Sequence, residues 1–199
     1  MEVKDYFNKL REVRDVSIAT IDKKGIPQVR IIDVMIVKED RLFFLVARGK
    51  AFYQQLLNNP TVALVGLTKD WESIRMMGRV EHCNQDMLVD IFADNPNMYG
   101  IYPGDSSRIL EVFCLKDGYG EYFNLSGHPI YREYFSFGTG KIKEEGYLIT
   151  HACQLCNKCY ESCPQSCIEV GRPYQIVKEN CLHCGLCYEV CPYQAIRMI

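Results

Sequence analysis

The sequence predicts a mostly β fold with some α-helix (α+β), followed by a smaller α+β unit that is rich in cysteine. Short segments rich in Val, Ile and Phe follow one another with turn signals between them, and helical patterns are few. Eight of the 11 cysteines lie near the C-terminus in a repeated pattern. We expect three parts: a barrel domain at residues 1–125, a connecting segment at 126–146 and a cysteine-rich domain at 147–199.

The first part is expected to open with a helix at 3–12, where apolar residues recur at helical spacing. Strands are then expected at 16–22, 26–37, 41–47, 61–68 and 73–83. A hairpin of segments 109–117 and 118–125 should turn at Asp117–Gly118. Further helices are expected at 50–59 and 84–94. Strands that follow each other with so few helices between them predict a mostly antiparallel sheet or barrel.

The cysteine pattern is C-x2-C-x2-C-x3-C-P, and it occurs twice with matching positions 28 residues apart, as from Cys153 to Cys181. The first run consists of Cys153, Cys156, Cys159 and Cys163. The second run consists of Cys181, Cys184, Cys187 and Cys191. Thiolates held this close repel one another unless a positive core neutralises them or oxidation removes their charge.

Disulfides, zinc and iron–sulfur clusters are the three alternatives for these thiols. No apolar leader opens the sequence, so we expect a cytoplasmic protein, and disulfides are rare there. Zinc sites usually combine two close ligands with a long spacer, whereas three ligands here follow at spacings of three. The repeated run is the pattern that holds iron–sulfur clusters, which we favour over zinc.

In runs of this kind the fourth cysteine ligates the other cluster. We therefore expect one 4Fe–4S cluster on Cys153, Cys156, Cys159 and Cys191, and another on Cys181, Cys184, Cys187 and Cys163. Residues 147–199 as a whole resemble a bacterial-type ferredoxin with two such clusters. Cys167, Cys83 and Cys114 are expected to be small buried side chains, and His183 a group near the cluster or at the surface.

Composition narrows the classes of partner. The formal net charge is −2 and shows no basic excess, so nucleic-acid binding is not expected. No apolar run approaches the roughly 18 residues that a membrane span needs.

The stretch from Gly25 to Leu67 resembles the FMN-binding split barrel of the pyridoxamine 5′-phosphate oxidase-like superfamily. The shared cues are a strand with a basic residue, a Phe-Phe strand, Gly-Lys-Ala opening a helix, and Asn-Asn-Pro closing it. The segment MMGRVEH resembles the next strand of that fold. The resemblance covers about residues 1–125, and it implies bound FMN and a homodimer.

The resemblance implies specific FMN contacts. Lys50 and Gly49 open a helix, where free N–H groups favour an anion, and Arg30 or Arg48 can reach the same phosphate. The ring would lie along Val29, Ile31 and Phe44, with Ser73 at its polar edge. The alternative for each residue is an ordinary place in the strand core or at the surface. Vitamin B6 oxidation is not expected, because the chain lacks the basic, tryptophan-containing C-terminal segment of those oxidases.

Together the two parts predict an oxidoreductase in which two 4Fe–4S clusters pass single electrons and FMN exchanges two with a small substrate. One alternative is an electron-transfer protein that uses FMN as a relay and has no substrate of its own. Another is a structural protein that holds zinc and lacks flavin. Either a redox partner protein or a small acceptor is expected. No catalytic acid or base is assigned, and His128 and His151 are expected to be satisfied or exposed.

Overall fold

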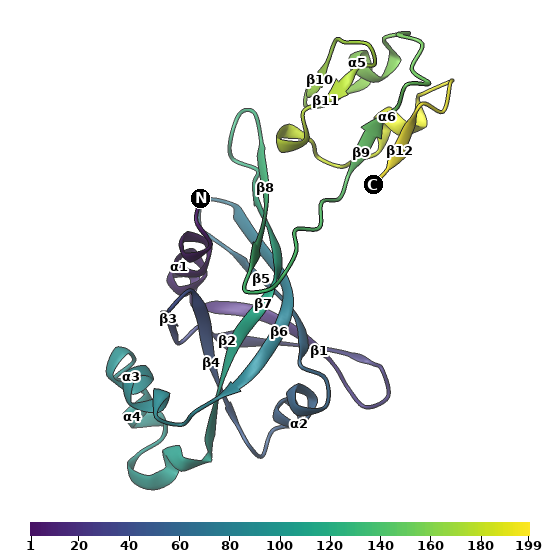
Figure 1. Cartoon of the computed structure of the whole chain (residues 1–199). Coiled ribbons are helices and arrows are strands. Elements are labelled where there is room, and N and C mark those ends of the chain that lie inside the picture. Colours follow the sequence, from purple (N-terminus) through teal and green to yellow (C-terminus); the bar gives the residue numbers. More distant parts are fainter. The chain divides into compact units, whose positions relative to one another are not determined.

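The computed structural model describes all 199 residues, and they form two compact units (Figure 1). Unit 1 comprises residues 1–69, 73–122 and 135–142. Unit 2 comprises residues 70–72, 123–134 and 143–199. The segment expected to connect two domains, 126–146, is therefore divided between the units.

An eight-stranded sheet forms the frame of unit 1, in the order β2-β1-β5-β6-β7-β4-β3 with β8 beside β7. The pairs β1–β2, β1–β5, β5–β6, β4–β7 and β3–β4 are antiparallel, as predicted. Because β2 at one end of this order contacts β4 near the other end, the sheet curls toward a barrel. The strands are β1 (Asp15–Ile21), β2 (Pro27–Asp33), β3 (Ile36–Lys38), β4 (Arg41–Ala47), β5 (Thr61–Leu67), β6 (Glu72–Cys83), β7 (Leu110–Asn124) and β8 (Tyr131–Phe137).

Helix α1 (Val3–Val13) packs on β1, β3, β4 and β5 and closes the main core. Its apolar stripe buries Tyr6, Phe7 and Leu10 completely, and each such burial stabilises the fold by about 1.5–3 kcal/mol. The ring of Tyr6 stacks on Phe135 at 4.0 Å between centroids, and Phe7 meets Phe137 edge-on at 5.3 Å. Strand β8, which lies in the segment expected to connect the two domains, thus supplies two core side chains.

The other helices of unit 1 are α2 (Ala51–Asn58), α3 (Met87–Asp94), α4 (Met98–Ile101) and the 3-10 helix η1 (Gly104–Ile109). The last three form an excursion between β6 and β7 with its own apolar cluster, which includes Ile91, Phe92, Met98 and Leu110. The sequence predicts α2 and α3. It misses α4 and η1, because four and six residues are too short to show a helical period.

The expected strand 26–37 is interrupted in the structure. β2 ends at Asp33 and β3 begins at Ile36. Between them, the N–H of Val34 donates to the carbonyl oxygen of Arg14 at 2.8 Å, and the N–H of Met35 donates to that of Phe43 at 2.9 Å. Both side chains are buried, so the apolar pattern continues through a break that hydrophobicity alone does not reveal.

The predicted hairpin turn at Asp117–Gly118 is wrong, because β7 runs through it to Asn124. A Cβ atom on Gly118 would lie 2.2 Å from the carbonyl oxygen of Met77 on β6. Glycine is therefore present for close approach between strands and not for a turn. The chain reverses after Asn124, whose Oδ1 accepts hydrogen bonds from the N–H groups of Ser126 and Gly127 at 2.9 and 3.3 Å.

Unit 2 consists of short elements around the two cysteine runs. Besides its helices and the β7–β8 hairpin, unit 2 contains two antiparallel strand pairs, β9–β12 and β10–β11. Its core contains Ile149, Ile168, Tyr174 and Ile196 together with cysteines of both runs. None of the chain's helices has the length and apolar character to cross a membrane. The elements are β9 (Tyr147–Ile149), α5 (Lys158–Ser162), β10 (Ile168–Glu169), β11 (Gln175–Ile176), the 3-10 helix η2 (Lys178–Asn180), α6 (Leu186–Glu189) and β12 (Ile196–Met198).

The close approach at Gly118 leads to a stability prediction. Gly118→Ala should destabilise unit 1 by about 1–3 kcal/mol, because its methyl group must displace backbone of β6. Gly100→Ala is the matched control, since a Cβ there meets nothing within 4 Å. Urea unfolding followed by circular dichroism measures both. Equal stability of the two variants would contradict the continuous β7.

Candidate functional site

The 28-residue repeat of the sequence is also present in the backbone of unit 2. Asn157 and Gly185 precede α5 and α6 and have left-handed φ angles of 64° and 80°. Leu155 and His183, which also correspond, both have a φ of 57°. Repeated left-handed residues make each run wind as a loop and turn backbone N–H groups toward one point. Each loop can therefore surround a bound group.

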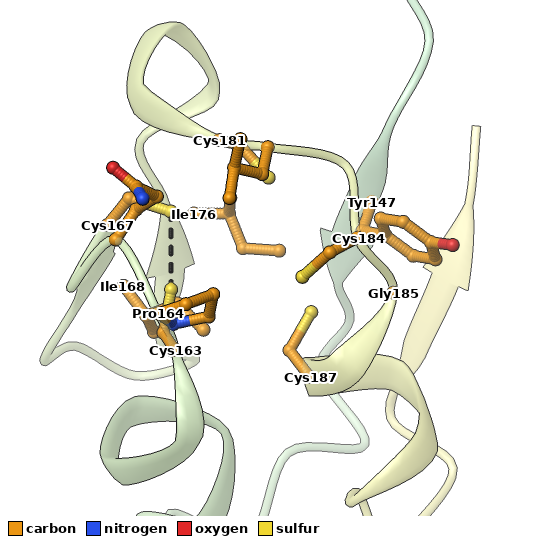
Figure 2. Close-up of a pocket in the computed structure, with 12 residues that line it drawn as sticks. Tyr147, Cys163, Pro164, Cys167, Ile168, Ile176, Cys181, Cys184, Gly185 and Cys187 are labelled. Atoms are coloured by element: carbon orange, nitrogen blue, oxygen red, sulfur yellow. Dashed lines mark hydrogen bonds between the residues drawn. The ribbon is translucent and has the colours of Figure 1, made fainter. Parts of the chain in front are cut away.

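The fourth cysteine of each run lies in the cavity formed by the other run. The second cavity is lined by Cys163 together with Cys181, Cys184 and Cys187. Figure 2 shows these thiols approaching the space from two segments, Cys163 beyond the end of α5 and Cys184 and Cys187 around the start of α6. The first cavity is lined by Cys153, Cys156, Cys159 and Cys191.

The thiols of each set surround a space and do not meet at a point. No three His, Cys, Asp or Glu side chains converge closely enough to hold a single metal ion. Backbone N–H groups reach two of the sulfurs, from His183 to Cys181 Sγ and from Ala195 to Cys191 Sγ, both at 3.4 Å. The arrangement therefore combines four sulfur donors per cavity with N–H groups that favour negative charge on sulfur.

The second cavity has a fifth thiol. Cys167 is buried, as expected, but it also lines the cavity, with its Sγ 3.5 Å from that of Cys163. A hydrogen bond from Cys167, aided by the N–H of His183 and the charge of Arg132, lowers the pKa of Cys181 to about 6 despite its burial. Burial raises the pKa of Cys187 to about 11. The first cavity has Ala195 in place of this thiol.

Unit 1 contains a different cavity, beside β2 and the start of α2, with a volume of about 380 Å³. Two cations, Arg30 and Lys50, lie in its wall with the acidic Asp33. The rest of the wall is mostly apolar, and includes Val46, Leu110 and the excursion residues Met98 and Tyr102. A cavity with cationic groups and an apolar wall can bind a flat, phosphorylated ligand.

Arg30 is held in place by three contacts. Its two terminal nitrogens donate to Thr20 Oγ1 at 2.8 Å and to Gln55 Oε1 at 2.9 Å. The guanidinium carbon lies 4.3 Å from the centre of the Phe52 ring. Burial lowers the pKa of Arg30, but an arginine stays protonated at any physiological pH. A positioned guanidinium with five N–H donors can bind an anion in the cavity.

The structure separates the eight residues predicted for flavin. Arg30, Ile31 and Lys50 line the cavity. Val29 directly precedes Arg30 on β2, is 73% exposed and points to the outer face of the sheet. Gly49 adjoins Lys50 in the turn before α2, and a Cβ on it would meet nothing within 4 Å.

Three other predicted residues lie away from the cavity wall. Phe44 is buried in the core, with its ring 6.0 Å from that of Phe52 and 5.9 Å from that of Phe113. Ser73 pairs with Leu67 near the start of β6. Arg48 forms an ion pair with Glu111 at 2.6 Å.

Sequence reasoning missed Thr20, Gln55 and Phe52, which orient Arg30. Strand alternation was the available signal. On β2, Gln28, Arg30 and Ile32 share the less exposed face, and Val29 and Ile31 share the more exposed one. Placing Arg30 on the inner face requires buried polar partners from β1 and α2, which Thr20 and Gln55 provide.

Glu111 is a buried carboxylate held by two basic groups. Its two oxygens lie 2.6 Å from Arg48 and 2.6 Å from His82 Nε2. The ring of His82 stacks on Phe113 at 5.0 Å. Burial alone would raise the pKa of Glu111, but the hydrogen bonds from Arg48 and His82 outweigh it and hold the pKa below its usual value. Arg48 is thus occupied by a structural ion pair.

Two family models match the chain, one almost entirely within unit 1 and one within unit 2. Residues 4–109 match the family model described as pyridoxamine 5′-phosphate oxidase, and residues 174–197 match that of the 4Fe-4S binding domain. No curated protein matches the chain.

Three solved structures share the fold of unit 1. A NimC/NimA family protein from Clostridium acetobutylicum is 22% identical, with 68% of this chain and 93% of that chain covered and a TM-score of 0.59. A protein from the same organism, related to general stress protein 26 of B. subtilis and of the pyridoxinephosphate oxidase family, is 15% identical (70% and 97% covered, TM-score 0.52). A heme binding protein from Mycobacterium smegmatis is 13% identical (69% and 58%, TM-score 0.51).

The ion pair of Glu111 leads to a pH-dependent prediction. A carboxylate whose pKa is lowered on folding stabilises the fold above its unfolded pKa of about 4.3, and this contribution is lost as pH falls through the folded value. Glu111→Gln should therefore cost about 1–3 kcal/mol at pH 7 and progressively less below pH 4. Urea unfolding at several pH values measures it. Asp90→Asn, which breaks the exposed Lys38–Asp90 pair, should cost far less at pH 7; an equal loss would contradict the assignment.

Proposed function

The chain belongs to the pyridoxamine 5′-phosphate oxidase family, and from this membership we propose that it is a flavin- and iron–sulfur-dependent oxidoreductase of the cytoplasm. Unit 2 would carry two 4Fe–4S clusters, and the cavity of unit 1 would hold FMN. The substrate would be a small molecule that exchanges two electrons, and single electrons would come from or go to a redox partner.

The crossed arrangement of the eight thiols carries this proposal. A 4Fe–4S cluster is a cuboidal body held by four thiolates, so its ligands must surround a space. A zinc ion instead needs four ligands within about 2.3 Å of one point. Each cavity of unit 2 has four thiols around a space rather than at one point, which supports a cluster over a single ion. The N–H groups of His183 and Ala195 would stabilise the negative charge of a bound cluster.

The unit 1 cavity fits the chemistry of FMN. Arg30 and Lys50 supply positive charge for a phosphate, and Arg30 is fixed by Thr20 and Gln55. The apolar wall can cover a flat ring while Ile31 lies at its rim. Phe44 would support FMN binding indirectly. Its ring stacks on that of Phe52, and the guanidinium of Arg30 lies over the Phe52 ring.

When bound, the clusters would supply one-electron transfer and the flavin one- or two-electron transfer. The residues of the chain bind and insulate these groups. Thr20, Gln55 and Phe52 orient Arg30, while Met98 and Tyr102 of the excursion line the cavity and would shield a bound ring.

The outer face of the unit 1 sheet supports a homodimer. Val29, Ala19, Ala63 and Met77 lie opposite one another across β2, β1, β5 and β6. Val29 and Met77 are 73% and 44% exposed, as are their apolar neighbours Ile31, Val65 and Leu67 at 62%, 40% and 52%. A contiguous exposed apolar face of this kind is typical of a protein interface. Sedimentation of the full chain should therefore show twice the chain mass of 23.0 kDa.

Anaerobic reconstitution with iron, sulfide and FMN tests the proposal. About eight iron atoms and eight acid-labile sulfides should bind per chain, and the reduced clusters should pass electrons to the flavin in stopped-flow absorbance. Cys163→Ala should impair only the cluster of the second cavity, whereas Cys114→Ala, outside both cavities, should keep both clusters. Negligible iron would refute the cluster assignment. Electron transfer without turnover of any screened acceptor would favour an electron-transfer protein that lacks a substrate of its own.

Arg30 yields a separate prediction for the flavin. Arg30→Met should weaken FMN binding roughly 10- to 100-fold, the loss of one or two charge-assisted hydrogen bonds. Riboflavin has no phosphate, so its affinity should hardly change. Lys23→Met, in an exposed turn, removes the same charge and should leave FMN binding intact. Quenching of flavin fluorescence measures each affinity. Equal losses for FMN and riboflavin would show that Arg30 does not bind the phosphate, and preferential binding of heme would overturn the choice of cofactor.

A further inference from the structure

Arg132 of β8 is a buried cation beside the second cysteine run. It is only 7% exposed, and its Nε donates a hydrogen bond to the backbone oxygen of Cys181 at 3.3 Å. Its guanidinium carbon lies 4.2 Å from the centre of the Phe123 ring. Arginine keeps its proton when buried, so the site carries a permanent positive charge.

A second hydrogen bond fastens the same hairpin to the same run. Asn180 Nδ2 donates to the carbonyl oxygen of Ile130 at 2.8 Å. Residues 123–134 of the β7–β8 hairpin and residues 180–181 belong to one compact unit, so these contacts lie within unit 2. Cys181 itself lines the second cavity. The charge of Arg132 is therefore held at a fixed place next to one of the two cavities.

We propose that Arg132 raises the reduction potential of the cluster in the second cavity above that of the cluster in the first. This inference rests on the proposed function, because it requires both clusters. Reduction adds one electron to a cluster that is already negative. A fixed positive charge stabilises the reduced form more than the oxidised form, and low exposure to water strengthens the effect.

The two cysteine runs differ in sequence as well as in their contacts with the hairpin. The repeat pairs Cys181 with Cys153 and Asn180 with Ala152. Alanine has no amide to fasten a hairpin, so the first run lacks the side chain that makes this clamp. Two runs with the same ligand spacing thus stand in different electrostatic surroundings. Electrons that enter unit 2 would settle on the cluster of the second cavity.

Redox titration of the full-length holoprotein, followed by electron paramagnetic resonance, tests this. Dithionite with mediators donates one electron to each cluster, and no proton is required. Arg132→Gln should lower the reduced-to-oxidised ratio of one cluster at a given solution potential by roughly tenfold, equivalent to about 59 mV. The other cluster should not move. Arg132→Lys keeps the charge and should restore most of the potential, while Arg172→Gln, at an exposed position, should change neither cluster.

Ligand variants identify which signal belongs to which cavity. Cys184→Ser should alter the cluster that Arg132→Gln shifts, and Cys156→Ser should alter the other. Unchanged potentials in Arg132→Gln would overturn the proposal, and so would an equal shift in Arg132→Lys. If Arg132→Gln fails to fold, titration of the unaltered protein tests the proposal. The cluster of the second cavity must then be reduced at a higher potential than the cluster of the first. A protein without iron would instead refute the proposed function.

Discussion

The exchange of one cysteine between the two runs is the constraint on which unit 2 depends. Its strands have two or three residues and its helices four or five, lengths that are unstable in isolation. Its core is small and includes cysteines of both runs. Because Cys163 and Cys191 each reach the opposite cavity, any group that four thiols bind would tie the two halves together. Folding of this unit and binding of its metal would then be one process.

Unit 1 places two arginines, Arg30 and Arg48, in contact with partners of different charge. Arg30 lies in the middle of β2 and Arg48 directly follows β4, and the two arginines have different partners. Arg48 neutralises the buried Glu111, while Arg30 is held by the uncharged Thr20 and Gln55. An arginine held by neutral groups keeps its full charge toward the cavity, whereas one paired with a carboxylate does not. This difference in partners is the reason why we propose Arg30, and not Arg48, as the group that binds the phosphate.

The sequence predicts the parts of this protein that local pattern controls. The helix at 3–12, the strand at 41–47 and the succession of antiparallel strands are all present. The four thiols that cysteine spacing assigns to each cluster line one cavity, while their ligation of a cluster stays a prediction. It failed where tertiary packing decides. Gly118 has the local signature of a turn, yet the approach of β6 makes it part of a long strand. The ring of Phe44, which the resemblance places along the flavin, is buried beside those of Phe52 and Phe113, and its contact with flavin stays a prediction. No role was predicted for Arg132, because the segment around it was expected to connect two domains.

The shared cavities also set the order of events during synthesis. The first cavity needs Cys191, and the second needs Cys187, so neither is complete when the first run has left the ribosome. The sheet of unit 1 through β8 is already translated by then. The barrel can therefore fold while the chain is still growing, whereas both proposed clusters could be in place only after Cys191 has been synthesised.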